Sequence, residues 1–238
     1  MRYTFQQGTA EWHQARLGRI TSTAAAALMT KARKAGEVSA TAKTEIYRIL
    51  AERNLRKEYR GAKFQEYLDR NAISSKAIEY GKATEDEARD FYSVNTGYEV
   101  QQLGFITPDD EELEPFWGDS PDGVIFDQDH KLVGCIEIKC PKSATFMEYK
   151  DAFTPRTEFA DSFSAAETLK AVESKYYWQV CNHLAVSGAD WCDFIVYDPM
   201  LRNGYICRRI NREDVASDIE ALTQTIKHTI QTIINSEL

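Results

Sequence analysis

One short stretch limits what this chain can fold into. In residues 133–141, only Glu137 and Lys139 interrupt a largely apolar run. Such a run predicts a strand, with Glu137 and Lys139 on one face and Ile136 and Ile138 on the other. A buried strand that carries two charges normally needs partners for them, either other charges or a metal ion. We therefore expect this strand to carry part of a functional site.

A second acid, Asp122, precedes this strand in the sequence Asp-Ser-Pro-Asp-Gly at residues 119–123. Taken alone, Pro-Asp-Gly is a common turn, and Glu137 with Lys139 fits a solvated strand face. Taken together, two carboxylates can hold a divalent ion, and an ammonium beside them can steer a water or steady the charge on a phosphoryl group. The combination favours metal-dependent hydrolysis of a phosphodiester.

Glu85 lies in a segment, residues 74–95, that reads as one long helix with Gly97 near its end. Ile78 and Ala88 mark its apolar face, and Glu85 falls close to that face, whereas the two acids after it fit a solvated surface. An inward-pointing ligand and an exposed helical acid both remain open for Glu85.

The rest of the pattern places helices first, then a cluster of strands, then a helix and more strands. This order indicates an α/β domain over residues 1–238, with a central mixed β-sheet flanked by helices. Residues 56–71 give no clear pattern, and hydroxyls at residues 21–23 precede an alanine run as a helix start would. The expected helices cover residues 42–55, 168–185 and 212–234, and the expected strands cover residues 98–107, 123–126, 132–139, 191–197 and 205–210.

Composition excludes several classes of protein. The 238 residues are 43% hydrophobic and 28% charged, as in an ordinary globular protein, and no apolar run approaches a membrane span. Residues 1–7 lack the apolar core of a secretory signal. The five cysteines show no CxxC spacing, which argues against disulfides and zinc knuckles and favours a reducing cytoplasm. The four histidines are scattered without a common metal-ligand spacing.

The net charge of −8 at first opposes nucleic-acid binding. Binding needs local rather than total positive charge, and the acidic cluster at residues 109–112 reads as a solvated turn. A ring or dimer that concentrates basic side chains inward would remove the objection. The basic loop Lys31, Arg33 and Lys34 is a candidate for such a DNA path.

Several motifs in chain order resemble the lambda-exonuclease family of phage recombination nucleases, the YqaJ-type viral recombinases of the PD-(D/E)xK superfamily. Residues 53–71 and 148–168 depart from the family pattern. The matching residues are Trp12, His13, Arg16, Gly18, Ile20 and Thr21; Gly81, Lys82 and Glu85; Ser120 to Gly123; Glu137 to Pro141; Tyr176 and Gln179; and Tyr197 to Pro199.

The resemblance implies a Mg²⁺ site, with Mn²⁺ as a substitute. Asp122, Glu137 and the backbone carbonyl of Ile138 would be ligands, and Glu85 would act directly or through water. Lys139 would orient or activate the attacking water.

The resemblance also gives Gln179 the task of positioning Lys139 or the scissile phosphate. Arg16 and Thr23, with Ser22 as an alternative, match positions that hold a terminal 5′-phosphate. Hydroxyls at a helix start and an arginine also suit an anion on physical grounds. Without the resemblance, a capping box and a surface arginine would be the favoured explanation.

For the whole chain, the resemblance implies a 5′-to-3′ exonuclease on double-stranded DNA that leaves 3′ single strands for recombination. It further implies a homotrimeric ring, a phage single-strand annealing partner and the cytoplasm of a bacterial host. Two alternatives stay open. One is a structure- or site-specific endonuclease on the same core, and the other is a DNA-end-binding subunit whose site has decayed. Cleavage of circular DNA would distinguish the endonuclease.

Overall fold

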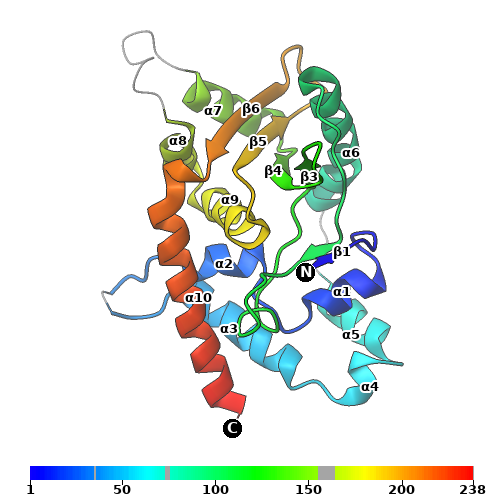
Figure 1. The fold of residues 1–238 in the computed structure, drawn as a ribbon, viewed down its shortest axis with the longest axis vertical. Helices are drawn as coiled ribbons and strands as arrows, with labels where there is room; N and C mark the ends of the chain where they lie inside the picture. The colour runs from blue at the N-terminus through cyan, green and yellow to red at the C-terminus, as the bar shows by residue number, and fades with distance from the viewer. Residues whose placement is uncertain (35, 73–75, 155–163, 238) are drawn as a thin grey trace.

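The computed structural model describes residues 1–34, 36–72, 76–154 and 164–237. Its centre is a mixed four-stranded sheet in the order β3-β4-β5-β6, with helices packed on both faces (Figure 1). A two-stranded ribbon, β1 with β2, lies beside the sheet. The strands are β1 (Arg2–Tyr3), β2 (Phe105–Ile106), β3 (Gly123–Phe126), β4 (Leu132–Lys139), β5 (Trp191–Tyr197) and β6 (Tyr205–Asn211).

Only the central strand pair of the sheet is parallel. β3 and β4 form an antiparallel hairpin, in which Gly123 lies opposite Ile136. β4 then pairs with β5 in parallel, with Glu137 opposite Phe194, and β5 turns back antiparallel into β6. Parallel strands need a long crossover. In its described part, the chain between β4 and β5 carries the helices α7 (Ser143–Phe153), α8 (Ala165–Val172) and α9 (Ser174–Ser187).

The two faces of β4 confirm the predicted alternation. Ile136 and Ile138 pack with Ala88 and Tyr92 of α6 (Lys76–Thr96). Glu137, between them, turns to the opposite face, where α9 covers the sheet. Charged and apolar side chains of one strand thus reach different layers of the molecule.

Helix α9 is the central helix of the second face. It packs against β4 and β5 on one side and against α2 (Ser22–Leu28) and α10 (Ala216–Glu237) on the other. The buried alanines at residues 24–27 let α2 approach α9 closely, because they carry only a methyl group. The remaining N-terminal helices are α1 (Ala10–Arg16), α3 (Ala40–Arg53), α4 (Lys57–Arg60) and α5 (Phe64–Asn71).

The sheet of four strands was predicted almost to the residue, but two expectations were wrong and one helix was missed. Of the strand expected at residues 98–107, only β2 forms, because its partner is the short N-terminal β1 rather than a neighbour in the sequence. The helix expected at residues 168–185 is two helices, broken at Glu173, whose backbone is not helical (φ −147°, ψ 81°). Helix α7 was not predicted.

The other helices agree more closely. The helix expected at residues 42–55 is α3, which starts earlier because the Ser39 hydroxyl caps it. The closing helix begins with a 3₁₀ turn at Glu213–Val215 before α10. The expected start of α6 at Ser74 lies outside the described residues. Gly97 ends α6 with a left-handed backbone (φ 75°), as predicted.

Candidate active site

The β3–β4 hairpin brings Asp122 to the charged face of β4. Asp122 stands directly before β3, and its backbone N–H donates to the carbonyl of Ile136 (3.1 Å). Its carboxylate reaches across and accepts from the backbone N–H of Ile138 (2.6 Å). Burial raises the pKa of Asp122 well above its usual range, and the charge of Glu137 raises it further. Lys139 acts in the opposite direction, but burial and the neighbouring carboxylates outweigh it.

Glu137 is buried and has a partner on each carboxylate oxygen. Oε1 contacts the ammonium of Lys139, and Oε2 lies 2.6 Å from Nε2 of His183. Burial alone would raise the pKa of Glu137, but Lys139 and His183 outweigh it and lower that pKa to about 2. Glu137 is accordingly an anion under ordinary conditions.

Lys139 is held as a cation. Its Nζ lies 4.7 Å from the centre of the Tyr176 ring and contacts Glu137. Burial disfavours the ammonium, yet Glu137 and Asp122 raise the pKa of Lys139 above its usual value. A protonated lysine donates hydrogen bonds and neutralises charge, so this arrangement favours orienting a water or phosphate over removing a proton.

Glu85 enters from α6, on the other side of the hairpin. Its carboxylate pairs with Arg89 (2.8 Å), whose guanidinium also donates to the carbonyl of Asp122 (2.9 Å). Burial raises the pKa of Glu85 although Arg89 opposes it, and Lys139 and Glu137 act on it as well. Glu85 thus points inward, as one of the two sequence interpretations held.

A cavity of about 440 Å³ opens onto this cluster. Three of the predicted site residues line it: Glu85, Ile138 and Lys139. Its other walls include Lys82 of α6 and Tyr176 of α9, so the cavity lies between the helices of the two opposite faces.

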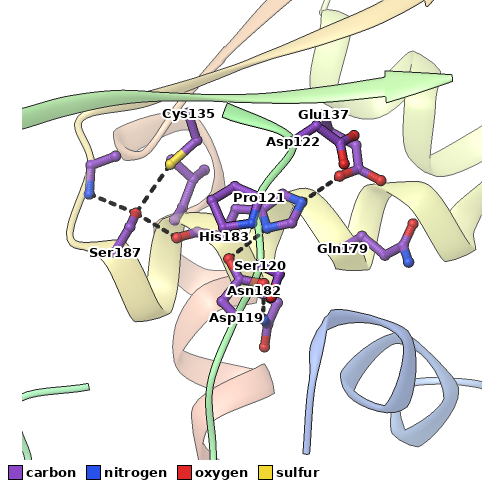
Figure 2. Close-up of polar contacts among 12 residues, drawn as sticks. Asp119, Ser120, Pro121, Asp122, Cys135, Glu137, Gln179, Asn182, His183 and Ser187 are labelled. Carbon is purple, nitrogen blue, oxygen red and sulfur yellow. Dashed lines mark hydrogen bonds and ion pairs between the residues drawn. The ribbon is translucent and has the colours of Figure 1, made fainter. Parts of the chain in front are cut away.

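Gln179 does not line that cavity. It is buried on α9, and its amide donates to the hydroxyl of Thr23 (3.3 Å). Its Oε1 has no hydrogen-bond partner among the residues that the structure describes. Figure 2 shows Gln179 on the same helix as His183, separate from the polar contacts around Glu137.

Arg16 and Thr23 line a second cavity, of about 310 Å³, at the N-terminal helices. The Arg16 guanidinium lies over the Trp12 ring (4.1 Å) and donates to the hydroxyl of Ser120 (3.0 Å). Burial lowers the pKa of Arg16 to about 10, although Asp119 opposes this. Thr23 is exposed here, whereas Ser22 is buried in α2.

The second cavity also contains a charge network of its own. Arg48 is paired with Glu45 (2.8 Å) and Glu52 (2.7 Å), so its charge is already balanced. Arg16 forms no salt bridge with a carboxylate among the described residues, which makes it the cation most available to an incoming anion. The predicted DNA-path residues Lys31, Arg33 and Lys34 are exposed in the loop after α2.

Comparison with known proteins identifies the chain's relatives. The family model for the YqaJ-like viral recombinase domain matches residues 11–190. The chain belongs to this family. Two solved structures of an alkaline exonuclease from Laribacter hongkongensis resemble it. One has 27% identity and a TM-score of 0.66 over 96% of both chains. The other, in complex with dAMP, has 28% identity and a TM-score of 0.65 over 96% of this chain and 92% of that one.

A phage-related exonuclease from Haemophilus somnus 129PT is similar in fold alone, with 14% identity and a TM-score of 0.54 over 92% of this chain and 96% of that one. No curated protein matches. Family and fold agree with those predicted from the motifs, and this YqaJ-like chain is a nuclease of the exonuclease type, an enzyme that hydrolyses phosphodiester bonds. In the described ranges, every helix is too short or too polar to cross a membrane.

Sequence reasoning missed the residues behind Glu137. His183 bridges Glu137 and the buried Asp119, with 2.6 Å to each carboxylate (Figure 2). Asn182 donates to the other oxygen of Asp119 (3.0 Å). Glu137 and Asp119 together raise the pKa of His183 to about 10, against the effect of burial. The available signal was the spacing of His183 four residues after Gln179, which places both on one face of a helix.

Proposed function

We propose that this YqaJ-like nuclease is a Mg²⁺-dependent exonuclease that degrades one strand of double-stranded DNA from the 5′ end. The product would be a 3′ single-stranded overhang for phage-type recombination by strand annealing. One observation carries the proposal. The hairpin of β3 and β4 gathers Asp122, Glu137 and Lys139 at one point, beside a cavity that Glu85 also lines.

The chemistry of these residues fits a divalent metal. Asp122 and Glu137 supply hard oxygen ligands, the kind that Mg²⁺ prefers, and the Ile138 carbonyl would add a third. Burial and neighbouring carboxylates raise the pKa of Asp122, so a cation would relieve an unfavourable concentration of negative charge. Among the described residues no group of three His, Cys, Asp or Glu side chains is arranged to hold a metal ion by itself. The proposed set accordingly depends on a carbonyl and on water, with Glu85 near enough to contribute.

The protein's own groups would prepare the phosphate for attack. Mg²⁺, when bound, supplies a water of lowered pKa and offsets charge at the phosphate. The Lys139 ammonium, held between Glu137 and the Tyr176 ring, donates to the attacking water or to a phosphate oxygen. Gln179 is buried on α9 with an unpartnered Oε1 among the described residues, and its proposed role is to help position Lys139 or the scissile phosphate.

Arg16 and Thr23 would select the 5′-phosphorylated end. The guanidinium already lies over the Trp12 ring and is held by Ser120, which reduces the freedom that it must lose on binding phosphate. Ser120 is two residues before Asp122, so one loop connects the end-binding cavity to the metal ligands. A fixed separation between the end-binding cavity and the metal ligands would set the direction of degradation.

A homotrimeric ring around the DNA would explain how a chain of net charge −8 stays on its substrate. Closed rings arise when heterologous contacts return to the first subunit. Light scattering at micromolar protein is expected to give three times the 27.2 kDa of one chain. A monomer that still degrades long duplexes in one binding event would contradict the ring. The proposed partner is a phage single-strand annealing protein.

One set of substrates tests the function. Linear duplexes with a 5′-phosphate or a 5′-hydroxyl, and a covalently closed circle, are incubated with and without Mg²⁺. We expect Mg²⁺-dependent release of nucleotides from the 5′-phosphorylated linear duplex, slower release from the hydroxyl form and no cleavage of the circle. Cleavage of the circle would support the endonuclease alternative, and absence of all cleavage would support an end-binding subunit.

A further inference from the structure

The buried surroundings of Glu137 contain a group to which neither the motifs nor the proposed chemistry gives a task. His183 lies on α9 and is almost fully buried, with 1% of its side chain exposed. Each ring nitrogen lies 2.6 Å from a carboxylate oxygen, Nε2 from Glu137 and Nδ1 from Asp119. A neutral imidazole has one donor nitrogen and one acceptor nitrogen, so two short contacts to two buried acids need an explanation.

The contacts on the Asp119 side of His183 are fixed. Asp119 is fully buried, with Oδ2 at His183 and Oδ1 accepting from Asn182 (3.0 Å). Asn182 in turn accepts from the indole N–H of Trp117 (2.8 Å). No oxygen of Asp119 is left over, so the ring of His183 cannot rotate without breaking a buried hydrogen bond.

The contacts of Glu137 determine which of its carboxylate oxygens is available to a metal ion. Oε2 is occupied by His183, and Oε1 faces Lys139. Without the ring, the carboxylate could rotate and present either oxygen, or turn both toward Lys139. The contact with His183 therefore fixes the orientation of Glu137.

We propose that His183, supported by Asp119, is a positioning residue that holds Glu137 in the orientation for binding one divalent ion through a single oxygen. The inference rests on the proposed function, because it assumes that Glu137 is a metal ligand. Partners behind metal ligands commonly change metal affinity by about 10–100-fold when they are removed.

Two substitutions of the same residue separate this role from packing. In His183→Gln, the amide nitrogen lies as far along the side chain as Nε2, so it can still donate to Glu137. In His183→Asn, the amide nitrogen corresponds to Nδ1, so it can still donate to Asp119 but not to Glu137. Both variants lose the ring and its charge. His228→Asn, at an exposed position of α10, is the control.

Calorimetric titration with Ca²⁺ measures metal binding without turnover, and Mg²⁺ titration of cleavage gives the apparent affinity in the reaction. We expect His183→Asn to weaken both by about tenfold or more. We expect His183→Gln to stay within about threefold of the wild type and His228→Asn to be unchanged. Equal affinities in the Gln and Asn variants, at equal thermal stability, would overturn the proposal.

A measurement on the unaltered protein covers the case in which neither variant folds. The Nε2–H proton resonance of His183 is expected to shift when Ca²⁺ is added, and more than that of Nδ1–H. No shift at saturating Ca²⁺ would overturn the proposal. If the proposed function itself were wrong, the wild type would neither bind Ca²⁺ nor cleave with Mg²⁺. That result is distinguishable from failure of the His183 proposal alone.

Discussion

Two regions differ in how their charges are balanced. One is the carboxylate centre of Asp122, Glu137 and Glu85, and the other is the Arg16 cavity, the second cavity described above. Asp122, directly before β3, and Glu137, on β4, lie close to Glu85 on the long helix α6, with Lys139, His183 and Arg89 as their charged partners. Arg16, on the short helix α1, is held among the described residues by an aromatic ring and a hydroxyl.

The difference suggests a division of work, in which the carboxylate centre binds the metal and the Arg16 cavity binds the phosphate. A metal site needs oxygens at fixed positions, and hydrogen bonds to buried partners supply that rigidity. A phosphate pocket needs an available cation, and a guanidinium without a carboxylate partner supplies it. The loop that contains Asp119, Ser120 and Asp122 contacts both regions. The side chains that would bind the metal and the phosphate are nevertheless different, so each region should fail separately when its own residues are changed.

The largest effect is expected at the carboxylate centre. Asp122→Ala or Glu137→Ala should lower Mg²⁺-dependent cleavage by more than about 100-fold, because a direct ligand should cost more than a supporting partner. Single-turnover cleavage of a 5′-phosphorylated duplex measures this. The matched control is Asp129→Ala in the exposed turn between β3 and β4, which should be unchanged. Cleavage at the wild-type rate by either variant would refute the metal assignment.

Lys139→Ala should reduce turnover far more than DNA binding, because its ammonium is placed to act on the reacting groups. Lys131→Ala, at the exposed end of the same strand region, is the control. Binding by fluorescence anisotropy and single-turnover cleavage separate the two effects. Weakened affinity with unchanged cleavage would make Lys139 a contact to the DNA backbone only.

Arg16→Ala should reduce the preference for 5′-phosphate over 5′-hydroxyl ends. A hydrogen bond to a charged group is worth about 1.5–3 kcal/mol, roughly a 10- to 150-fold preference. Thr23→Ala should cost about 0.5–1.5 kcal/mol. Arg202→Ala, exposed in the loop between β5 and β6, is the control, and competition binding with the two duplex ends is the measurement. A wild type that treats both ends alike would contradict end selection.

The smallest effect belongs to the loop after α2. Neutralising Lys31, Arg33 and Lys34 together should weaken binding at low salt and flatten its salt dependence. Each lost phosphate contact lowers the slope of log affinity against log salt by roughly one unit. An unchanged slope would show that the loop is a solvated surface away from the DNA.

Sequence patterning anticipated the strands of the main sheet and the two faces of β4, because the period of two follows directly from burial on either side. It also indicated Asp122, Glu137 and Lys139 as a group. The break at Glu173 could not be predicted, because no glycine or proline marks it. His183 was missed because its partners Asp119 and Glu137 lie far away in the sequence and meet it only once α9 packs on the sheet.

A crossed measurement on Glu137→Ala, Arg16→Ala and the double variant tests the division of work most directly. Cleavage with Mg²⁺ and phosphate preference with Ca²⁺ are measured for each. Glu137→Ala is expected to lose cleavage and keep its preference for the 5′-phosphate, and Arg16→Ala to lose that preference and still cleave at saturating DNA. The double variant should show both losses in full. If either single variant lost cleavage and end preference together, the two regions would form one site and the account would be contradicted.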